Sequence, residues 1–371
     1  MGKCLSNCFR SLEQTVEIPR PSEKSEKCDG VLSLPMVPYG GTIRKVLILR
    51  KSTRWSWEKE LNASLSDEEL KQYLSSRGEN TFELLSNEKK QSDFVKKLVD
   101  DFRDLGVTAQ VVTRSQLKEL LPGADLVISA GGDGTYLTAA SAITDDTPII
   151  GINSDPVGSE GHLCVGGKNP PPDLLENVVL RNVKWKTRCR IRVTIESPES
   201  APIVALALNE AFIAEQDAST MSTYQISIDG LPMNKQKSSG VLIATGTGST
   251  AWLRTMCSID SDDVSRVVNA LNTQGANLVI DDVVARHTAS LVNDTIPFSP
   301  DDPRFVFFIR EGVCNSTFHV DNVKSQASFI EMKSQMRQGK IVVDGNNIYE
   351  FGRGSKATFE MDPDSGLKTL F

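Results

Sequence analysis

The stretch Asp125-Leu-Val-Ile-Ser-Ala-Gly-Gly-Asp-Gly-Thr-Tyr-Leu-Thr-Ala-Ala-Ser141 sets the organisation of the chain. In it an apolar, β-branched run meets three glycines around one aspartate, and good helix formers begin at Thr135. A strand, a glycine turn and a helix together expose backbone N–H groups and a helix N-terminus, which bind phosphate. We therefore predict a strand over 126–130, a helix over 135–143 and a phosphate site at the turn between them.

The residues of this turn have two kinds of chemistry. Gly131, Gly132 and Gly134 allow backbone angles and close approaches that a Cβ would block. Asp133 is different, because a carboxylate repels phosphate. Its presence indicates that it handles a proton or a metal ion. A tight turn with a helix cap is the purely structural alternative for so short a motif.

Strands that alternate with helices surround the turn. This alternation favours right-handed βαβ units in a parallel sheet, whose ligands bind at the carboxyl ends of the strands. A central strand is expected over 45–50, and its end carries Lys51 and Arg54, so we expect one of them to contact phosphate; a solvated strand exit is the alternative. We also predict strands over 108–113 and 148–152, helices over 89–105 and 115–121, and a capping box of Ser66 and Glu69.

From about Val183 the pattern changes to long strand runs with few crossovers, which favours a β-rich second domain. The expected fold class is therefore α/β, with an N-terminal parallel-sheet domain followed by a β-rich domain. We predict a poorly ordered leader over 1–40, an α/β domain over 41–165, and a β-rich domain over 175–371 whose last part can return to the first domain. Helices are expected over 262–272, with Ser261 as the cap, and over 281–293.

Composition excludes several classes of protein. The net charge of −7 argues against a general nucleic-acid binder, which needs a basic surface. Seven cysteines at irregular spacings and only three histidines indicate reduced thiols and no structural zinc, although Mg²⁺ could arrive with a nucleotide. There is neither a Gly-x-x-x-x-Gly-Lys-Ser/Thr motif nor a Gly-x-Gly-x-x-Gly after a strand, so P-loop and dehydrogenase-type sites are disfavoured.

The leader carries two competing targeting signals. Met-Gly-Lys-Cys-Leu-Ser fits the N-myristoylation pattern at Gly2, and Cys4 could carry a palmitoyl chain, so one hypothesis is anchoring to a membrane from the cytosol. The rival is a mitochondrial transit peptide, although acidic residues from Glu13 onward are unusual for one.

Three motifs together resemble one family of kinases. Residues 131–135, Gly-Gly-Asp-Gly-Thr, resemble a signature shared by NAD kinases, diacylglycerol and sphingosine kinases, and phosphofructokinase-type enzymes. Residues 208–213, with Asn209-Glu210, resemble the Asn-Glu/Asp motif of NAD kinases, and residues 245–252 resemble their Thr-Gly-Ser-Thr-Ala-Tyr segment. Lipid kinases are not expected to carry the last two. The likeness runs from about Lys45 to the C-terminus and is greatest to the mitochondrial branch of NAD kinases.

The resemblance implies an activity and a set of binding residues. It implies ATP-dependent phosphorylation, with Mg²⁺, of the 2′-hydroxyl of the adenosine ribose of NAD, in a mitochondrial homodimer. Asp133, the only carboxylate of the glycine loop, is the candidate base, and its rival role is holding the metal. The expected nucleotide-binding residues are Gly131, Gly132, Gly134, Thr135, Asn209, Glu210, Thr247, Gly248, Ser249, Thr250, Ala251 and Trp252.

Structural alternatives stand beside several of these roles. Asn209 and Glu210 are neighbours in an alternating strand, so both can contact one NAD only if the strand bends or ends near Leu208, which we predict. Ser249 or Thr250 could instead cap a following helix, and Trp252 could be a core residue rather than a stacking face for adenine. The pairs Asp229-Gly230 and Asp344-Gly345 are predicted hairpin turns without assigned chemistry.

Two other functions remain open at this point. A lipid kinase would share the glycine loop and would suit an acylated leader. A non-enzymatic NAD(P)-binding protein is the third possibility, because Ser239 and Gly246 depart from the pattern of the larger NAD kinase branch. Retention of Asp133 argues against that third reading.

Overall fold

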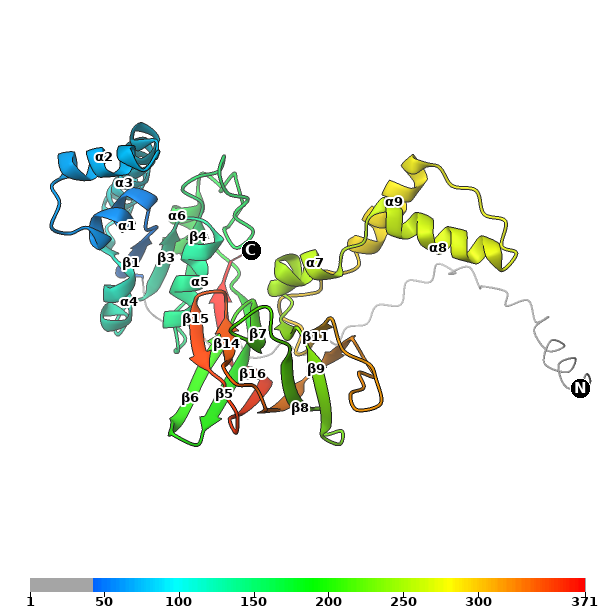
Figure 1. The fold of residues 1–371 in the computed structure, drawn as a ribbon. Coiled ribbons are helices and arrows are strands. Elements are labelled where there is room, and N and C mark those ends of the chain that lie inside the picture. The colour runs from blue at the N-terminus through cyan, green and yellow to red at the C-terminus, as the bar shows by residue number, and fades with distance from the viewer. Residues whose placement is uncertain (1–42, 371) are drawn as a thin grey trace, which may run out of the picture. The chain divides into compact units, whose positions relative to one another are not determined.

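The computed structural model describes residues 43–370 of the chain (Figure 1). The predicted leader lies outside the described residues, and so do Gly2 and Cys4, the residues of the acylation hypothesis. Among those described, no helix combines the length and the apolarity that a membrane crossing requires.

A parallel sheet forms the first half of the described chain. Its strand order is β2 (Thr108–Val112), β1 (Lys45–Arg50), β3 (Leu126–Ala130) and β4 (Ile149–Ile152), and β1 is central as predicted. Side chains alternate between two faces along β1. One face packs against α3 (Thr81–Asp104) and α6 (Leu174–Val179), and the other packs against α4 (Arg114–Leu120) and α5 (Asp133–Ala142).

Helix boundaries differ from the predictions in informative ways. Helix α5 begins at Asp133, two residues before the predicted start, because Gly132 serves as its N-cap. Helix α3 begins at Thr81 rather than Lys89, because the Asn80 side chain accepts a hydrogen bond from the Glu83 N–H and caps it there. The predicted capping box of Ser66 and Glu69 is confirmed in α2 (Asp67–Ser76). Sequence reasoning missed α6 and also α1 (Arg54–Leu61), which occupies the expected strand exit.

The second half of the chain is mostly antiparallel strand. Some of its strands extend the parallel sheet, because Thr369 near the end of β16 (Lys356–Thr369) pairs in parallel with Ile149 of β4. The resulting ten-stranded sheet continues through β13 (Phe329–Ser334), β8 (Ser222–Ile228) and β9 (Asn234–Ser238), and β16 also pairs with β5 (Lys186–Ser197), which pairs with β6 (Ser200–Ala207).

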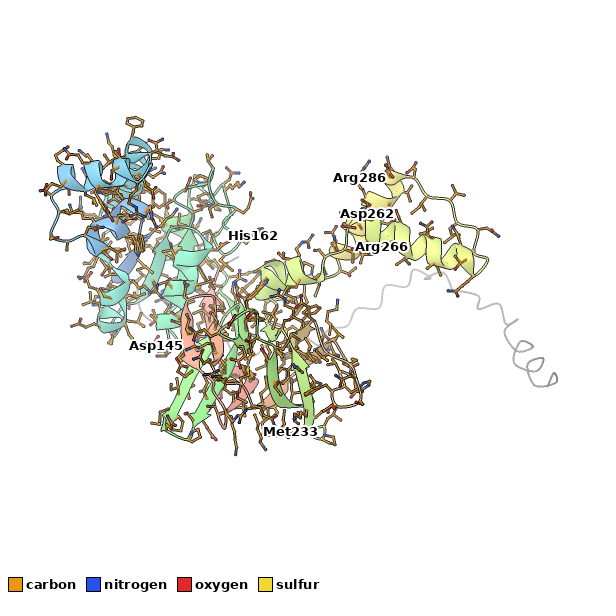
Figure 2. All side chains as sticks on the ribbon, viewed as in Figure 1. Asp145, His162, Met233, Asp262, Arg266 and Arg286 are labelled. Carbon is orange, nitrogen blue, oxygen red and sulfur yellow. The ribbon has the colours of Figure 1, made fainter. Side chains whose placement is uncertain are left out.

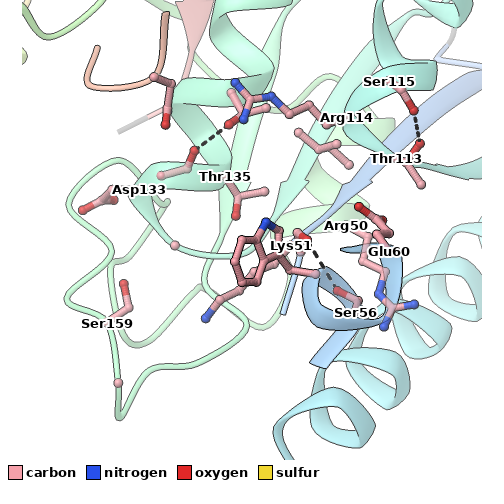
Figure 3. Close-up of a pocket in the computed structure, with 18 residues that line it drawn as sticks. Arg50, Lys51, Ser56, Glu60, Thr113, Arg114, Ser115, Asp133, Thr135 and Ser159 are labelled. Carbon is pink, nitrogen blue, oxygen red and sulfur yellow. Dashed lines mark hydrogen bonds between the residues drawn. The ribbon is translucent and has the colours of Figure 1, made fainter. Parts of the chain in front are cut away.

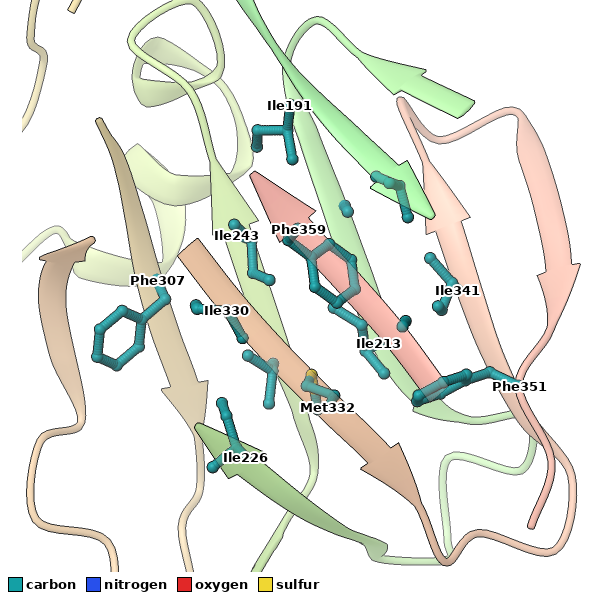
Figure 4. Close-up of a cluster of buried hydrophobic side chains, with 14 of the residues drawn as sticks. Ile191, Ile213, Ile226, Ile243, Phe307, Ile330, Met332, Ile341, Phe351 and Phe359 are labelled. Carbon is teal, nitrogen blue, oxygen red and sulfur yellow. The ribbon is translucent and has the colours of Figure 1, made fainter. Parts of the chain in front are cut away.

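A second sheet has six strands. Apolar side chains from both sheets fill the space between them, including Ile191, Ile243 and Phe359 (Figure 4). The predicted fold class, a parallel α/β half followed by a β-rich half, is confirmed; the division near residue 165 stays a prediction. The strand order of the second sheet is β12 (Lys324–Ala327), β11 (Phe305–Arg310), β10 (Gly240–Ala244), β7 (Glu210–Glu215), β14 (Gly339–Val343) and β15 (Asn347–Glu350).

Two predicted local features of this half are confirmed. The strand run over 203–214 breaks between β6 and β7, so Leu208 and Asn209 lie outside both strands. The residues Asp229 and Asp344 have positive φ angles of 47° and 49° and each precedes a glycine, as in the tight turns that join two antiparallel strands.

A helical segment interrupts the strands between β10 and β11. It contains α7 (Trp252–Cys257), α8 (Ser261–Thr273) and α9 (Asp282–Asn293), and a small apolar cluster joins α8 to α9 (Figures 1 and 2). The cap of α8 is Asp260 rather than the predicted Ser261, because the carboxylate of Asp260 accepts from the N–H groups of Asp262 and Asp263. Exposed apolar side chains on this pair are Val267, Leu271, Val283, Val284, Leu291 and Val292.

Candidate active site

The glycine loop is packed too closely for side chains at two positions. A Cβ at Gly131 would lie 2.4 Å from the Thr135 hydroxyl oxygen, and one at Gly132 would lie 2.6 Å from that of Ser159. Real Cβ atoms do not approach other atoms this closely. The two glycines therefore bring the loop against its surroundings and place the first N–H groups of α5 at the end of β3.

Asp133 is held by the backbone of a distant loop. Its carboxylate accepts hydrogen bonds from the N–H groups of His162, at 3.1 Å, and Leu163, at 2.8 Å. Its position in the first turn of α5 is electrostatically favourable for a negative charge. The side chain is only partly buried and lines a cleft, so the carboxylate is oriented but remains accessible.

The cleft has a volume of about 1080 Å³, which suits a nucleotide (Figure 3). Four residues of the predicted glycine motif, Gly132 to Thr135, form one wall. Asn346, which follows the Asp344-Gly345 turn, lies at the margin, so both halves of the chain contribute. The other lining residues include Lys51, Ser56, Trp57, Thr113, Arg114, Thr138 and Ser159.

The two basic candidates at the end of β1 have different surroundings. Lys51 lines the cleft, and its Nζ lies 3.9 Å from a carboxylate oxygen of Asp155. Arg54 instead lines a smaller adjacent cavity of about 290 Å³ and pairs with Glu58 at 2.6 Å and with Glu79 at 3.6 Å. Lys51 is therefore the better placed of the two to meet a phosphate in the cleft.

Sequence reasoning missed two further residues of this cleft. Arg114 occupies the first turn of α4, where a positive charge is unfavourable, and it forms no ion pair among the described residues. Figure 3 places it across the cleft from Lys51. Trp57 presents a ring that is 41% exposed, with the Arg54 guanidinium 4.4 Å from its centroid. The rule that ligands bind at strand ends could have identified Arg114, which closely follows β2.

The corner that contains Asn209 and Glu210 is buried and incompletely hydrogen-bonded. Both residues are over 90% buried, with exposed fractions of 7% and 8%. Within the described part of the chain, the Asn209 Oδ1 and Glu210 Oε2 atoms have no hydrogen-bond partner. Burial, and secondarily the charge of Asp344, raises the pKa of Glu210 to about 8. Buried polar atoms without partners are costly, which is consistent with atoms that await a ligand.

Two neighbouring segments fix the backbone of this corner. The carboxylate of Asp344 accepts from the N–H groups of Leu208, Asn209 and Glu210. The backbone carbonyl of Asn209 accepts from the N–H of Thr245 at 2.9 Å. A Cβ at Gly248 would lie 2.2 Å from the Asn209 carbonyl oxygen, so this glycine is required for the loop to pack on the corner.

The hydroxyls of Ser249 and Thr250, in the loop after β10, donate to backbone carbonyls of the same loop. Ser249 Oγ donates to the Gly246 carbonyl at 2.6 Å and accepts from the N–H of Phe298, while the Thr250 hydroxyl donates to the Thr247 carbonyl. Neither caps α7, whose N-cap is Ala251 without a side-chain hydrogen bond. The capping alternative is therefore wrong, because the short helix η1 (Gly248–Thr250) precedes α7.

Trp252 is not a core residue. Its side chain is 38% exposed, and its ring lies 4.6 Å from the Phe212 ring, centroid to centroid, with an angle of 46° between planes. Phe212 thus supports the indole from one side. The exposed part of the ring stays available for stacking.

Arg188, which sequence reasoning also missed, links the three motifs. Its guanidinium is buried and donates to the Thr247 hydroxyl at 3.3 Å. It also interacts electrostatically with Tyr136 and Asp133, and burial lowers its pKa. Leu208 packs in one apolar cluster with Tyr136 and Leu163. These contacts place the glycine loop, the Asn209 corner and the Thr247 loop around one region.

Comparison with known proteins connects this geometry to a family. A family model described as the ATP-NAD kinase N-terminal domain matches residues 47–180, and one described as the ATP-NAD kinase C-terminal domain matches residues 208–256. The chain is 31% identical to the mitochondrial NAD kinase 2 of Rattus norvegicus, over 96% of this chain and 95% of that protein. It is 31% identical to the Homo sapiens protein of the same name, over 88% and 84%.

Similarity of fold extends to a solved structure. The structure of yeast NADH kinase complexed with NADH aligns with 89% of this chain and 84% of its own, with a TM-score of 0.54 and 17% sequence identity. At that identity the likeness concerns the fold alone.

Proposed function

The chain belongs to the NAD kinase family, and we propose that it transfers the terminal phosphoryl group of ATP to the 2′-hydroxyl of the adenosine ribose of NAD, giving NADP. One observation carries the assignment to these residues. Asp133 is fixed at the start of α5, close to a corner where Asn209 and Glu210 hold buried acceptor atoms without partners. The ribose diol of NAD supplies two adjacent hydroxyls that can donate to these atoms.

The donor nucleotide occupies the cleft beside the glycine loop. The N–H groups and dipole of α5 face its phosphates, and Lys51 and Arg114, which also line the cleft, neutralise their charge. The exposed face of Trp57 is suited to the purine. Because a phosphoryl group carries several negative charges in the transition state, these donors supply much of the expected acceleration.

Mg²⁺ fits this arrangement as an ion that arrives with ATP. Among residues 43–370 there is no cluster of three or more histidine, cysteine or acidic residues that would form a protein cage for a metal. Mg²⁺ commonly binds through substrate phosphates, water and one or two carboxylates, and Asp133 would offer one in its rival role as a metal ligand. When bound, it would reduce the negative charge of the phosphates during transfer.

The acceptor NAD is held by the buried corner and the loop after β10. Glu210 accepts from the ribose diol, Asn209 can both donate and accept, and Trp252 stacks on the adenine. Asp133 removes the proton of the 2′-hydroxyl. An aspartate is a weak base for an alcohol, so in-line positioning contributes more than proton transfer.

The decisive experiment measures product with competing acceptors. The purified full chain is incubated with ATP and Mg²⁺ and either NAD, diacylglycerol or sphingosine. We expect NADP and no lipid phosphate. Lipid phosphate without NADP would identify the lipid-kinase alternative, and NAD binding without any transfer would identify the non-enzymatic one.

We also propose that the enzyme is a homodimer. The exposed apolar side chains of α8 and α9 support this, because such surfaces commonly mark interfaces. Sedimentation of the wild type should give a mass of two chains. The double variant Val284→Asp, Leu291→Asp should sediment as a monomer; a wild-type monomer would refute the proposal.

The mitochondrial matrix is the proposed location, on the ground that the relatives above are mitochondrial proteins. The alternative is acylation at Gly2 with Cys4 as the second site. Imaging separates the two. A mitochondrial signal unchanged in Gly2→Ala supports the matrix, whereas a membrane signal lost in that variant supports acylation.

A further inference from the structure

The turn between β14 and β15 contains a buried carboxylate with an unusual set of partners. Asp344, which is 4% exposed, accepts from the N–H groups of Leu208 at 2.9 Å, Asn209 at 2.7 Å and Glu210 at 3.1 Å. These three residues are consecutive and more than 130 residues away in sequence. A backbone that turns three successive N–H groups toward one side chain is a concave anion site, here filled by the protein itself.

Only an ionised carboxylate satisfies this site. Its two oxygens provide about four acceptor positions and no donor, so all three N–H groups can be bonded. An asparagine would offer one oxygen and would turn an NH₂ group toward an N–H group. The Asp344 backbone adds a further bond, because its N–H donates to the Glu210 carbonyl at 2.9 Å. The turn therefore fixes the peptide planes on both sides of Asn209.

The orientation of the peptide planes on both sides of Asn209 determines the directions of the Asn209 and Glu210 side chains. Glu210 is the first residue of β7, and Asn209 lies in the gap before it. Neighbours in an unbroken strand would point to opposite faces, so the break is needed for both to face one ligand. Asn209 Oδ1 and Glu210 Oε2 are the atoms of this corner that lack partners within the described residues.

We propose that Asp344 is a positioning residue for the acceptor nucleotide, which holds the Leu208–Glu210 backbone so that Asn209 and Glu210 together face NAD. This inference rests on the proposed function. Asp344 acts through the corner and not on the reacting atoms. Its effect is therefore on acceptor binding more than on phosphoryl transfer.

The chain contains a matched control for this role. Asp229 lies in a turn with the same positive φ followed by a glycine, and its carboxylate accepts from the N–H groups of Ser328 and Phe329, both at 2.9 Å. Those two residues carry none of the proposed ligand contacts. Asp229→Asn thus weakens a turn of the same kind by removing its carboxylate charge, without touching the acceptor corner.

The test compares Asp344→Asn with Asp229→Asn in the full chain, by steady-state kinetics with NAD and ATP varied separately and by thermal melting. We expect Asp344→Asn to raise KM for NAD by about tenfold or more, because bonds to a buried charged group are lost, while KM for ATP changes less than about twofold. Asp229→Asn should lower the melting temperature and leave both KM values near wild type. If Asp344→Asn does not fold, Asp344→Glu, which keeps the charge but displaces it, should raise KM for NAD in the same way.

Two results would overturn the proposal. One is an unchanged KM for NAD in a folded Asp344 variant. The other is a parallel loss of kcat and of affinity for both substrates, with melting behaviour like that of Asp229→Asn, since a general structural defect predicts that. Failure of the wild type to phosphorylate NAD would refute the proposed function instead, and calorimetric NAD binding to the same variants would then decide the role of Asp344.

Discussion

The carboxylates of Asp133 and Glu210 belong to neighbouring parts of the site but have opposite surroundings. Asp133 is partly exposed, accepts from two backbone N–H groups and borders a large open cleft. Glu210 is buried, and one of its oxygens has no partner among the described residues. The side of the site proposed for ATP thus has an oriented, solvent-accessible carboxylate before a highly charged ligand binds. The acceptor side is desolvated and becomes satisfied only when a ligand supplies hydrogen bonds.

The largest predicted effect tests Asp133, on the side of the site proposed for ATP. Asp133→Asn should reduce kcat by about 10³-fold, within the range for loss of a general base. The dissociation constant for NAD should stay nearly unchanged, because the acceptor corner is intact. Rapid-quench or coupled assays measure turnover, and calorimetry measures binding. Unchanged turnover would rule out Asp133 as the base, whereas a defect relieved by excess Mg²⁺ would favour its role as a metal ligand.

A second prediction concerns the buried carboxyl group of Glu210, on the side of the site proposed for NAD. Glu210→Gln should lower kcat/KM for NAD by about 30-fold in assays above pH 8, where the carboxyl is ionised, because the ribose diol then loses a charged acceptor. The same variant should be more stable than the wild type at pH 8 but not at pH 5. The folded-state pKa of about 8 lies above the ordinary value of 4.5, so the folded protein holds this proton more tightly. Its contribution to stability is present at low pH and is lost as pH rises toward 8.

Thermal melting of both proteins at pH 5 and pH 8 tests whether the stability of the wild type falls relative to Glu210→Gln as pH rises. If the difference in stability between the wild type and Glu210→Gln is the same at pH 5 and pH 8, Glu210 is not desolvated. The contrast drawn between Asp133 and Glu210 would then be wrong.

The third prediction separates the two basic residues that the sequence left as alternatives. Lys51→Gln should raise KM for ATP by about tenfold, because a charge facing the donor phosphates is removed. Arg54→Gln should change KM for ATP by less than about twofold, since its charge is already paired with Glu58 and Glu79. Equal effects of both substitutions on KM for ATP would contradict the assignment.

The smallest predicted effect concerns stacking. Trp252→Ala should raise KM for NAD by about fivefold, as expected for loss of one aromatic contact, and Trp252→Phe should restore most of the affinity. Steady-state kinetics with varied NAD measures KM for both variants. An equal loss in the two variants would indicate that Trp252 supports Phe212 rather than the nucleotide.

Local sequence was sufficient for the parts of the site that local physics determines. The strand, glycine turn and helix around Asp133 follow from propensity and from glycine packing. The strand break at Leu208 was predicted only by combining the alternation of side chains with the NAD contacts that the family resemblance implies for Asn209 and Glu210. Asp344 and Arg188 could not be assigned this way, because their partners lie far away in sequence. Asp344 and Arg188 are brought to the site only by the strand register and by the packing of the two halves against each other. The cap of α8 was missed because Asp260 and Ser261 are adjacent residues that can both cap a helix. The start of α3 was missed because the cap at Asn80 precedes the apolar face from which the helix was predicted to begin at Lys89.

The position of β16 in the sheet has a consequence for the order in which the two halves of the chain fold. Thr369 pairs with β4, and its hydroxyl accepts from that of Tyr136 in α5 at 2.7 Å, across 233 residues of sequence. Contacts of such separation form slowly, because most of the chain must be ordered before they can close. The half that carries the glycine loop therefore completes its sheet only after the β-rich half has been synthesised. During synthesis the edge of β4 should therefore stay unpaired until β16 has emerged, which exposes that half to aggregation.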